Sequence, residues 1–184
     1  MRAKRRTHPR KRKRNPSGTG ALSNLVQGMD SDDNAAADAY GKGVQLLARR
    51  EHAVAELAGK LKRQGFDGDA VSRAVDRLVD DGYLSDARFT EAFVRHRCEQ
   101  GQGPVKIRAA LAERGIDEAL AQEALERQAV DWLEQARAAR RKRFGGAPPA
   151  DKKERARQAR FLAGRGFESE HVYRVVDPRD DDEG

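Results

Sequence analysis

Apolar residues recur with the spacing of an amphipathic helix from residue 35 to residue 177. Glycines, prolines and capping residues divide this region into nine expected helices, three of them before residue 81. The run from Phe144 to Pro149, with two glycines and two prolines, is expected to be a linker between the seventh and eighth helices. The pattern therefore predicts an all-α protein.

The helix signals are densest between residues 81 and 115. Gly82 suits the position after a helix C-terminus, Ser85 is a good N-cap, and Asp86 follows in the first turn, where the helix dipole favours a carboxylate. Pro104 can begin a second helix after Gly101 and Gly103. Helical spacing predicts that one face of the helix after Ser85 packs inward, formed by Phe89, Ala92, Phe93 and His96. On another face, Glu91 and Arg95 are four positions apart and are expected to attract each other.

A short pattern occurs three times without a gap, beginning at Leu61, Leu111 and Leu162. In each copy a glycine follows the leucine by four positions, and an apolar residue and then an acidic residue come directly after it: Gly65-Phe66-Asp67, Gly115-Ile116-Asp117 and Gly166-Phe167-Glu168. We expect the glycine to end one helix in the left-handed region, the apolar residue to fold back on the leucine, and the acid to cap the next helix.

Each repeat is thus expected to be three helices, a unit that buries too little apolar surface to be very stable alone. The predicted fold is three tandem three-helix repeats, stacked into an elongated, curved, solenoid-like array. The expected boundaries are a disordered basic arm at 1–34, repeats at 35–84, 85–127 and 128–177, and an acidic tail at 178–184.

The composition supports thin helical layers rather than a wide core, since 38% of the 184 residues are hydrophobic and 36% are charged. One cysteine, Cys98, excludes an internal disulfide and fits a reducing compartment. No apolar run approaches the roughly 20 residues of a membrane helix, and no apolar segment follows the basic N-terminus, so a cytoplasmic protein is expected. The four histidines are scattered, which predicts no metal site and no cofactor, and His96 and Cys98 are expected to be partly buried packing residues.

The sequence contains no recognisable catalytic motif. The segment from Gly101 to Lys106 has the wrong spacing for a phosphate-binding loop, and no strand precedes it. There is no nucleophile elbow and no metalloprotease motif. The sequence thus offers no positive ground for an enzyme, although an enzyme without a familiar motif stays open.

The net charge of +7 depends on the first fourteen residues, which hold nine basic side chains and no acidic one. Three interpretations stay open: a non-specific nucleic-acid arm, a solvated tail, or a native start at Met29. The arm, if it binds DNA, would do so through residues that include Arg5, Arg6, Arg10, Lys11, Arg12, Lys13 and Arg14.

Beyond the arm, acidic residues are concentrated at helix starts and basic residues along helix bodies and ends. We predict two basic series as partner-binding surfaces, namely Arg88, Arg95, Lys106, Arg108 and Arg114 in the second repeat, and Arg137, Arg140, Arg141, Lys142 and Arg143 in the third. Mixed charge on a helical array is usually only a solvated face. A basic stripe along one surface would instead favour an acidic partner.

The central block is similar to the RecX family of small bacterial modulators of the RecA recombinase. The residues that carry the resemblance are the run from Gly82 to Phe89, then Phe93-Val94, Gly103-Pro104, Ile107, Leu111 and Gly115-Ile116. It extends on both sides, to the run from Leu47 to His52 with Glu56-Leu57, and to Phe161-Leu162 with Arg165-Gly166-Phe167.

The resemblance implies three tandem three-helix repeats, in agreement with the internal pattern. It also implies a partner, the RecA filament on single-stranded DNA, whose ATPase, strand exchange and co-protease activity the family restrains. The family members are not enzymes, and their motif residues look structural by position. The basic arm lies outside the family pattern, and helical repeats that bind DNA directly are the alternative function. We expect a monomer.

Overall fold

The computed structural model describes residues 19–177, and it describes side chains from residue 32 onward. Every regular element in this range is an α-helix. The helices are α1 (Thr19–Leu47), α2 (Val54–Arg63), α3 (Gly68–Asp80), α4 (Asp86–Glu99), α5 (Pro104–Ala112), α6 (Glu118–Arg127), α7 (Trp132–Phe144), α8 (Lys152–Gly164) and α9 (Ser169–Val176).

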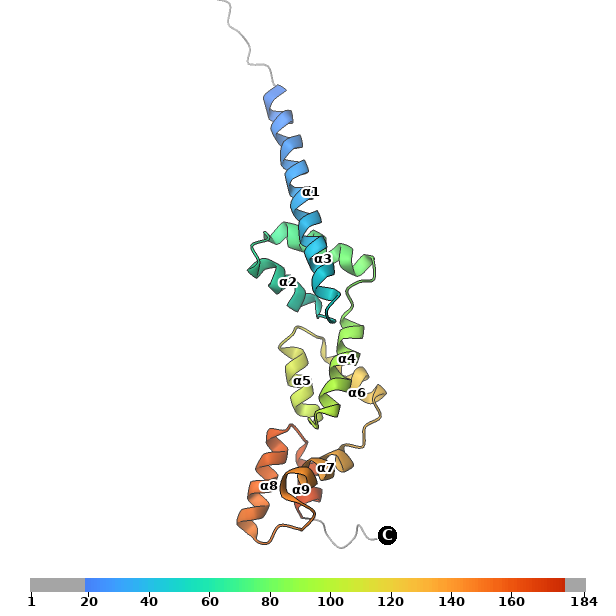
Figure 1. The fold of residues 1–184 in the computed structure, drawn as a ribbon, viewed down its shortest axis with the longest axis vertical. Coiled ribbons are helices and arrows are strands. Elements are labelled where there is room, and N and C mark those ends of the chain that lie inside the picture. Colours follow the sequence, from blue (N-terminus) through green and yellow to red (C-terminus); the bar gives the residue numbers. More distant parts are fainter. Residues whose placement is uncertain (1–18, 178–184) are drawn as a thin grey trace, which may run out of the picture.

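These helices form three units that follow one another along the long axis of the molecule (Figure 1). In each unit the third helix packs against both the first and the second, giving α3 on α1 and α2, α6 on α4 and α5, and α9 on α7 and α8. The same pairing three times over confirms the predicted all-α repeat fold and its elongated stacking.

The three repeated turns have the conformation that their sequences predict. Gly65, Gly115 and Gly166 have φ angles of 97°, 76° and 87°, in the left-handed region. The N–H of the following apolar residue donates to the carbonyl of the motif leucine in each case, at 3.4 Å for Phe66, 3.2 Å for Ile116 and 3.2 Å for Phe167. This is the six-to-one bond of a Schellman motif, so each helix ends where its leucine and glycine require.

The acid that follows each turn behaves differently in the third unit. Asp67 caps α3 by accepting from the N–H groups of Asp69 and Ala70, and Asp117 caps α6 by accepting from Ala119. Glu168 makes no side-chain cap on α9, and its carboxylate instead accepts from Arg108 at 3.0 Å. The predicted cap is therefore wrong at this one position, because the longer side chain reaches the preceding unit.

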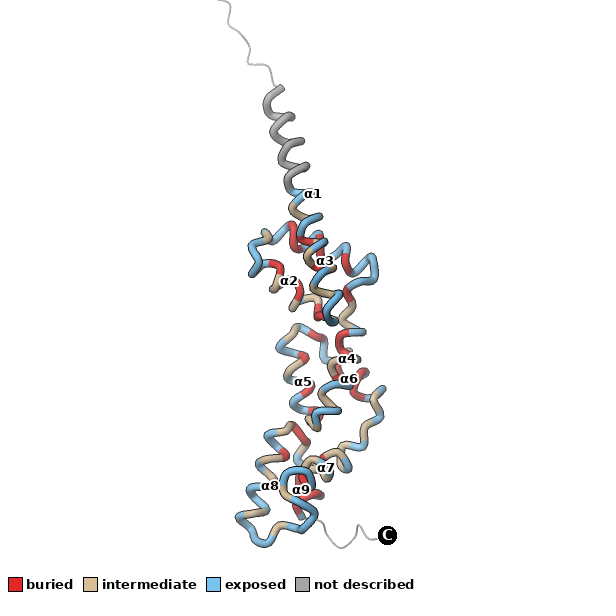
Figure 2. The backbone as a smooth tube through the Cα atoms, in the orientation of Figure 1, coloured by how far each residue is buried: buried red, intermediate tan, exposed pale blue. Residues whose placement is uncertain are grey.

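Each unit has its own apolar core, visible as the separate groups of buried positions in Figure 2. The first core contains Leu57, Leu61 and Leu78, and the third contains Leu162 and Phe167. Two residues join neighbouring cores. Ala53, from the segment before α2, is buried in the second core, and Trp132 of α7 packs against the second and third cores together.

The inner face of α4 is rotated relative to the prediction. Phe89 is buried as expected, but its buried companions are Thr90 and Val94. Phe93 is only partly buried, with the guanidinium carbons of Arg97 and Arg114 at 4.7 and 5.0 Å from its ring centre. The His96 side chain is 65% exposed, so its prediction as a packing residue is wrong, and Glu91 pairs with Arg127 rather than Arg95. Cys98 is partly buried, as predicted.

Helix α1 begins well before the expected end of the N-terminal arm at residue 34. The stretch contains Ala21, Leu22, Leu25 and Val26, and a helix that is anchored at its C-terminal end can extend into such residues at little cost because propagation follows nucleation. The basic residues at 2–14 and the acidic tail at 178–184 lie outside the described residues.

Candidate functional site

The junction between the second and third units, here called the second junction, is made by backbone groups. The N–H of Gly103 donates to the carbonyl of Arg165 at 2.9 Å, and the N–H of Val105 donates to that of Gly166 at 3.0 Å. A Cβ atom at position 103 would lie 2.3 Å from the carbonyl oxygen of Gly166. Only a residue without a side chain permits this approach, so Gly103 sets how closely the units dock.

Side chains reinforce the second junction from both sides. Arg165 donates to the carbonyl of Gln100 at 2.9 Å, and Gln135 donates to the carbonyl of Cys98 at 2.6 Å. The Arg108–Glu168 ion pair, at 3.0 Å, adds a further contact between the two units. The last turn of α4 and the start of α5 are thus held against the third unit by charged and neutral hydrogen bonds together.

The junction between the first and second units, the first junction, uses side chains instead. The N–H of Val54, at the start of α2, donates to the carboxylate of Asp86 at 2.8 Å. Arg88 pairs with Glu51 at 3.1 Å. Arg88 also donates to the carbonyls of Gly82 and Tyr83, so it fastens the turn before α4 to the first unit.

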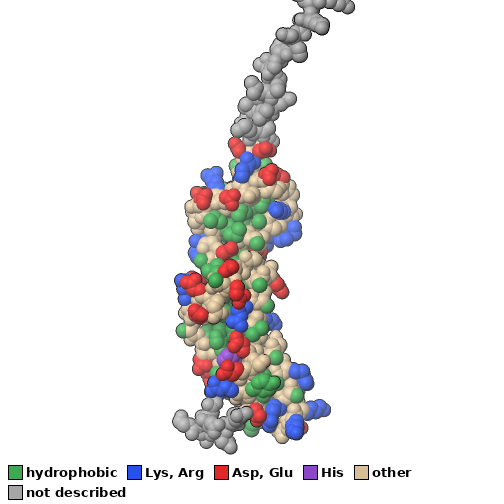
Figure 3. Space-filling view, turned by 180° about the vertical axis from the view of Figure 1, so that it is seen from behind, with side chains coloured by type: hydrophobic (Ala, Val, Ile, Leu, Met, Phe, Trp, Pro, Cys, Tyr) green, Lys and Arg blue, Asp and Glu red, His purple; other side chains and the backbone are tan. Residues whose placement is uncertain are grey.

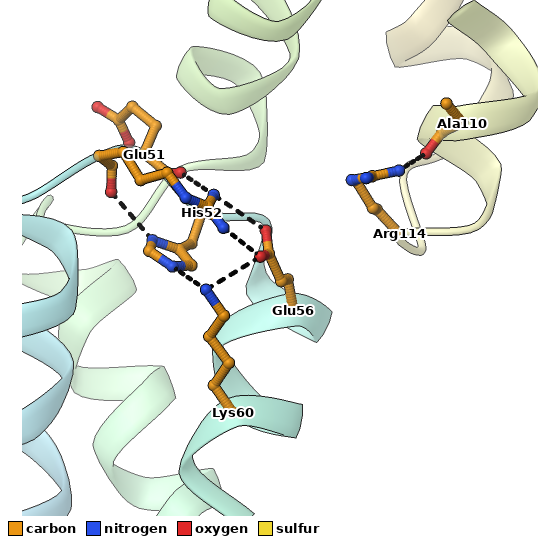
Figure 4. A network of polar contacts seen from close by, with 7 residues as sticks. Glu51, His52, Glu56, Lys60, Ala110 and Arg114 are labelled. Carbon is orange, nitrogen blue, oxygen red and sulfur yellow. Dashed lines mark hydrogen bonds and ion pairs between the residues drawn. The ribbon is translucent and has the colours of Figure 1, made fainter. Parts of the chain in front are cut away.

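A partly buried polar network surrounds His52, next to the residues of the first junction (Figure 4). Lys60 can only donate, so its contact of 2.7 Å with Nε2 requires that nitrogen to accept. The proton is therefore on Nδ1, which donates to the carbonyl of Arg50 at 3.0 Å. His52 is 2% exposed, and burial, together with the positive charges of Arg50 and Lys60, lowers its pKa. It is held neutral as a structural residue.

Glu56 anchors the same network. It accepts from Arg50 at 2.5 Å and pairs with Lys60 at 3.2 Å. Burial alone would raise the pKa of Glu56, but the hydrogen bonds from Arg50 and Lys60 and their charges outweigh it and bring the pKa to about 2. This network positions the segment between α1 and α2, which carries Glu51 and Ala53 into the first junction.

The predicted basic series of the second unit is divided by the structure. Arg88 and Arg108 belong to the two junctions, and Lys106 approaches the carbonyl of Gly164 at 3.4 Å. Arg114 donates to the carbonyl of Ala110 and stacks on Phe93. Arg95 is exposed and makes no ion pair or hydrogen bond with the described residues. The series is therefore a set of structural contacts with one uncommitted charge.

The predicted series of the third unit is divided in the same way. Arg140 is only 8% exposed; it donates to Gln158 at 2.7 Å and to the carbonyl of Ala147, which fixes the linker between α7 and α8. Arg141 pairs with Glu134 at 2.6 Å, and Arg137 lies 4.0 Å from the same carboxylate. Lys142 and Arg143 are exposed and pair with no acid among the described residues. Figure 3 shows Lys and Arg side chains gathered at the lower end of the molecule, over this unit.

Each junction leaves a groove on its surface. The second-junction groove, of about 430 Å³, lies between the end of α4, one face of α7 and the end of α8. Its lining includes three cations, Lys142, Arg143 and Arg165, against one acid, Glu99. The first-junction groove, of about 510 Å³, is balanced, with Arg63 and Arg114 against Glu56 and Glu113. The second groove is therefore the more positive of the two.

Sequence reasoning missed the role of Phe161 and Arg165 beside the basic residues of α7. The Arg165 guanidinium carbon lies 5.3 Å from the Phe161 ring centre, and Phe144 meets the same ring edge-on at 5.2 Å. The signal available was an arginine four residues after an aromatic residue in a helix, a spacing that places one side chain over the other.

No cluster of metal-ligating side chains occurs within residues 32–177, and no helix in the described part of the chain is long and apolar enough to cross a membrane. The predicted nucleic-acid arm at the N-terminus falls outside this range.

Comparison with known proteins gives one consistent result. Family models for the first, second and third three-helix domains of RecX match residues 39–78, 85–125 and 129–176. The regulatory protein RecX of Halorhodospira halophila is 46% identical over 154 residues, which are 83% of this chain and 96% of that protein. The regulatory protein RecX of Pseudomonas savastanoi is 41% identical over 140 residues, which are 76% of this chain and 90% of that protein. The crystal structure of RecX from Lactobacillus salivarius shares the fold, with a TM-score of 0.67 at 19% identity, covering 78% of this chain and 96% of the other.

Proposed function

The chain belongs to the RecX family, and we propose from this that it binds the RecA filament on single-stranded DNA and restrains its activity. The restrained activities are ATP hydrolysis, strand exchange and co-protease function. The observation that carries the proposal is the match of all three repeat models, in order, to a chain whose relatives are named regulatory proteins. The protein would act as a monomer, in the cytoplasm where the filament forms, without a cofactor and without chemistry of its own.

The shape of the molecule supports this proposal. The three units form an elongated stack, and a stack of this kind can span more than one subunit of a filament (Figure 1). The second junction is held by backbone hydrogen bonds, so the second and third units present one firm surface. A preformed surface loses little conformational freedom on binding, which favours affinity.

The contact residues that we propose are the exposed basic side chains that make no ion pair or hydrogen bond within the described part of the chain. Arg95, Lys142 and Arg143 are exposed, and no carboxylate in the described part of the chain pairs with them, so their charges are available to an acidic partner. Arg88 and Arg108 stay in the proposal only as residues that hold the units in place, because their guanidinium groups are engaged at the junctions.

The direct test is an ATPase assay of RecA on single-stranded DNA with increasing amounts of this protein. We expect inhibition that saturates. An unrelated DNA-dependent ATPase on the same DNA is the matched control, because a protein that only sequesters DNA would inhibit both enzymes. An unchanged RecA rate at saturating protein would refute the proposal.

A second candidate function is direct binding to nucleic acid, favoured by the nine basic residues within positions 1–14. Phosphate contacts release counterions, so binding through this arm would weaken steeply with salt. Deletion of residues 1–28 should then lower affinity for bare DNA and flatten the salt dependence. Equal binding by the full and shortened chains at every salt concentration would leave the arm without this role.

A further inference from the structure

We propose that the second-junction groove holds one nucleotide of a single nucleic-acid strand, with the base against Phe161 and the phosphate between Lys142 and Arg143. This inference rests on the proposed function, since the strand would be the one that the recombinase carries. The proposal assigns a specific binding site to this chain, at the junction between the second and third units. Its test reports on that site independently of RecA inhibition.

The cavity has the size and shape for one nucleotide. It measures about 430 Å³, within the range of small-molecule sites in proteins. One wall is the end of α4 with Gln100 and Gly101, and the other is α8 with Phe161 and Arg165. Ala138 and Ala139 of α7 also line it, and their small side chains leave the space open.

The positive charge of the cavity is available for a phosphate. Lys142 and Arg143 are adjacent in the last turn of α7, and neither pairs with a carboxylate among residues 32–177. The Arg143 guanidinium carbon lies 5.7 Å from the centre of the Phe144 ring. Stacking on an aromatic face orients a guanidinium while its N–H edge stays free, the geometry that recognises phosphate oxygens.

The same cavity provides a surface for a base. Phe161 is partly buried, lines the groove, and is supported edge-on by Phe144. Arg165 stacks on Phe161, donates to the carbonyl of Gln100 and also lines the groove, so its planar guanidinium offers a second flat group for a base. Bases of any sequence stack on aromatic rings, because every base has a flat π face, and arginine adds cation–π contacts.

The first-junction groove lacks both the aromatic wall and the excess of cations, and so it serves as an internal comparison. It is larger, at about 510 Å³, but it has no aromatic residue in its lining and its two cations are matched by two acids. An aromatic wall beside unpaired cations is thus particular to the second junction. An acidic peptide from a protein partner would also be attracted by the cations, but it would have no use for the aromatic wall.

The test uses the full-length protein and a single-stranded oligonucleotide that contains 5-iodouracil as a photo-crosslinking base. Trypsin cleaves after Arg160 and Arg165, so Phe161 lies in its own peptide of five residues, Phe161 to Arg165. We expect ultraviolet light to attach the base to this peptide, as read by mass spectrometry. Crosslinks confined to other peptides, the N-terminal ones included, would overturn the proposal.

Variants sharpen this result. Lys142→Glu with Arg143→Glu should reduce the crosslink at Phe161 at least tenfold, whereas Lys152→Glu with Lys153→Glu, the same charge change on exposed residues outside the cavity, should reduce it less than twofold. Ala138→Trp fills the groove from an exposed helix position, so it should abolish the crosslink without altering Phe161. A persistent crosslink in Ala138→Trp would contradict the site.

Two further measurements separate the alternatives. A strand of equal length with an abasic position in place of the base should compete at least fivefold more weakly, because the phosphates remain but the stacking is lost. Polyglutamate that displaced the strand while the abasic and normal strands competed equally would indicate an acidic-peptide site and overturn the nucleotide proposal. RecA inhibition without a crosslink at Phe161 would leave the proposed function standing and remove this site alone.

Discussion

The two junctions between units look alike in sequence and differ in how they are held. In both, the repeated glycine turn of one unit lies against the start of the second helix of the preceding unit: Gly115 faces Ala55, and Gly166 faces Lys106. The first junction is held by a hydrogen bond from the first N–H of α2 to Asp86 and by an ion pair. The second is fastened by two backbone hydrogen bonds. One repeat architecture can therefore carry two kinds of coupling.

The difference begins with one methyl group. Gly103 and Ala53 both stand twelve positions before the motif glycine of their unit. Ala53 is fully buried and its methyl group packs into the second core, so the backbones at the first junction are kept apart. Gly103 has no such group, and the backbone of the third unit comes within hydrogen-bonding distance. The first junction then depends on charged side chains, which respond to pH and salt.

The largest expected effect comes from adding that methyl group to the second junction. Gly103→Ala places a Cβ atom 2.3 Å from the carbonyl oxygen of Gly166, and backbone cannot move aside cheaply. Overpacking costs about 1–3 kcal/mol and the two lost hydrogen bonds about 1 kcal/mol each. We expect a loss of about 3–5 kcal/mol in the free energy of unfolding of the third unit, and a looser particle in solution scattering.

Gly68→Ala is the matched control, because a Cβ at position 68 meets nothing within 4 Å. It should leave the free energy of unfolding unchanged or slightly raised, since alanine favours a helix. If Gly103→Ala unfolds at the same denaturant concentration as the control, the backbone contact does not hold the second junction.

The fold could be predicted because its signals are local. A glycine, the leucine four positions before it and the acid two positions after it act within one turn, so three copies of the pattern defined three units. The junctions could not be predicted in this way. Arg88 meets Glu51 across 37 positions and Arg108 meets Glu168 across 60, so their pairing depends on how whole units stack.

The inner face of α4 shows a second limit of sequence reasoning. Phe93 and Val94 are adjacent, and the helical pattern is compatible with either of them facing inward. Val94 is the fully buried choice, whereas Phe93 packs only partly against the core and its ring also contacts two arginines. The helical pattern also does not show which arginines are engaged: Arg88 and Arg108 pair across the junctions, and among the described residues Arg95 has no ion pair or hydrogen bond.

The second prediction is that acid loosens the first unit before the other two. The pKa of Glu56 is about 2 in the folded protein against an ordinary value of 4.5, so its contribution is present above pH 4.5 and is lost as the pH falls toward 2. The shift corresponds to about 2–3 kcal/mol after allowance for partial exposure. The pKa of His52 is also lowered, so its contribution to stability begins to fall below pH 6.5, before that of Glu56.

Hydrogen exchange measured peptide by peptide between pH 7 and pH 3, corrected for intrinsic exchange rates, distinguishes the units. Protection should fall first in α2 and α3 and last around the second junction. Glu56→Gln should remove most of the pH dependence that arises below pH 4.5 in the first unit, at the cost of lower stability at pH 7. Uniform loss of protection across all three units would show that the two junctions are equally sensitive to acid.

The third prediction concerns Phe93, which supports Arg114 beside the first-junction groove. Phe93→Ala should lower the free energy of unfolding by about 2 kcal/mol, less than a fully buried phenylalanine, because the side chain is only partly buried. Phe93→Leu keeps most of the apolar volume and removes the ring contacts with Arg97, Arg114 and Phe89, so about 1 kcal/mol should be lost. Equal losses in the two variants would place the whole contribution in the ring contacts.

The smallest expected effects separate the two inter-unit ion pairs. Arg108–Glu168 is the more sheltered pair, with side chains 28% and 43% exposed, and its coupling free energy in a double-mutant cycle should be about 0.5–1 kcal/mol. Arg88–Glu51 has side chains 47% and 37% exposed, and the second carboxylate oxygen of Glu51 is buried without a hydrogen bond, so its coupling should be about 0.5 kcal/mol or less.

The variants Arg88→Met, Glu51→Gln and their combination, with the corresponding set for Arg108 and Glu168, give both cycles by denaturant unfolding. Arg88→Met alone should cost more than its coupling to Glu51, because it also removes two hydrogen bonds to the carbonyls of Gly82 and Tyr83. That excess should persist in 1 M salt, whereas both couplings should shrink, since salt screens exposed charges more than it weakens neutral contacts. A coupling at the first junction larger than at the second would mean that Arg88 acts mainly through its charge, and not as the fastener of the turn before α4.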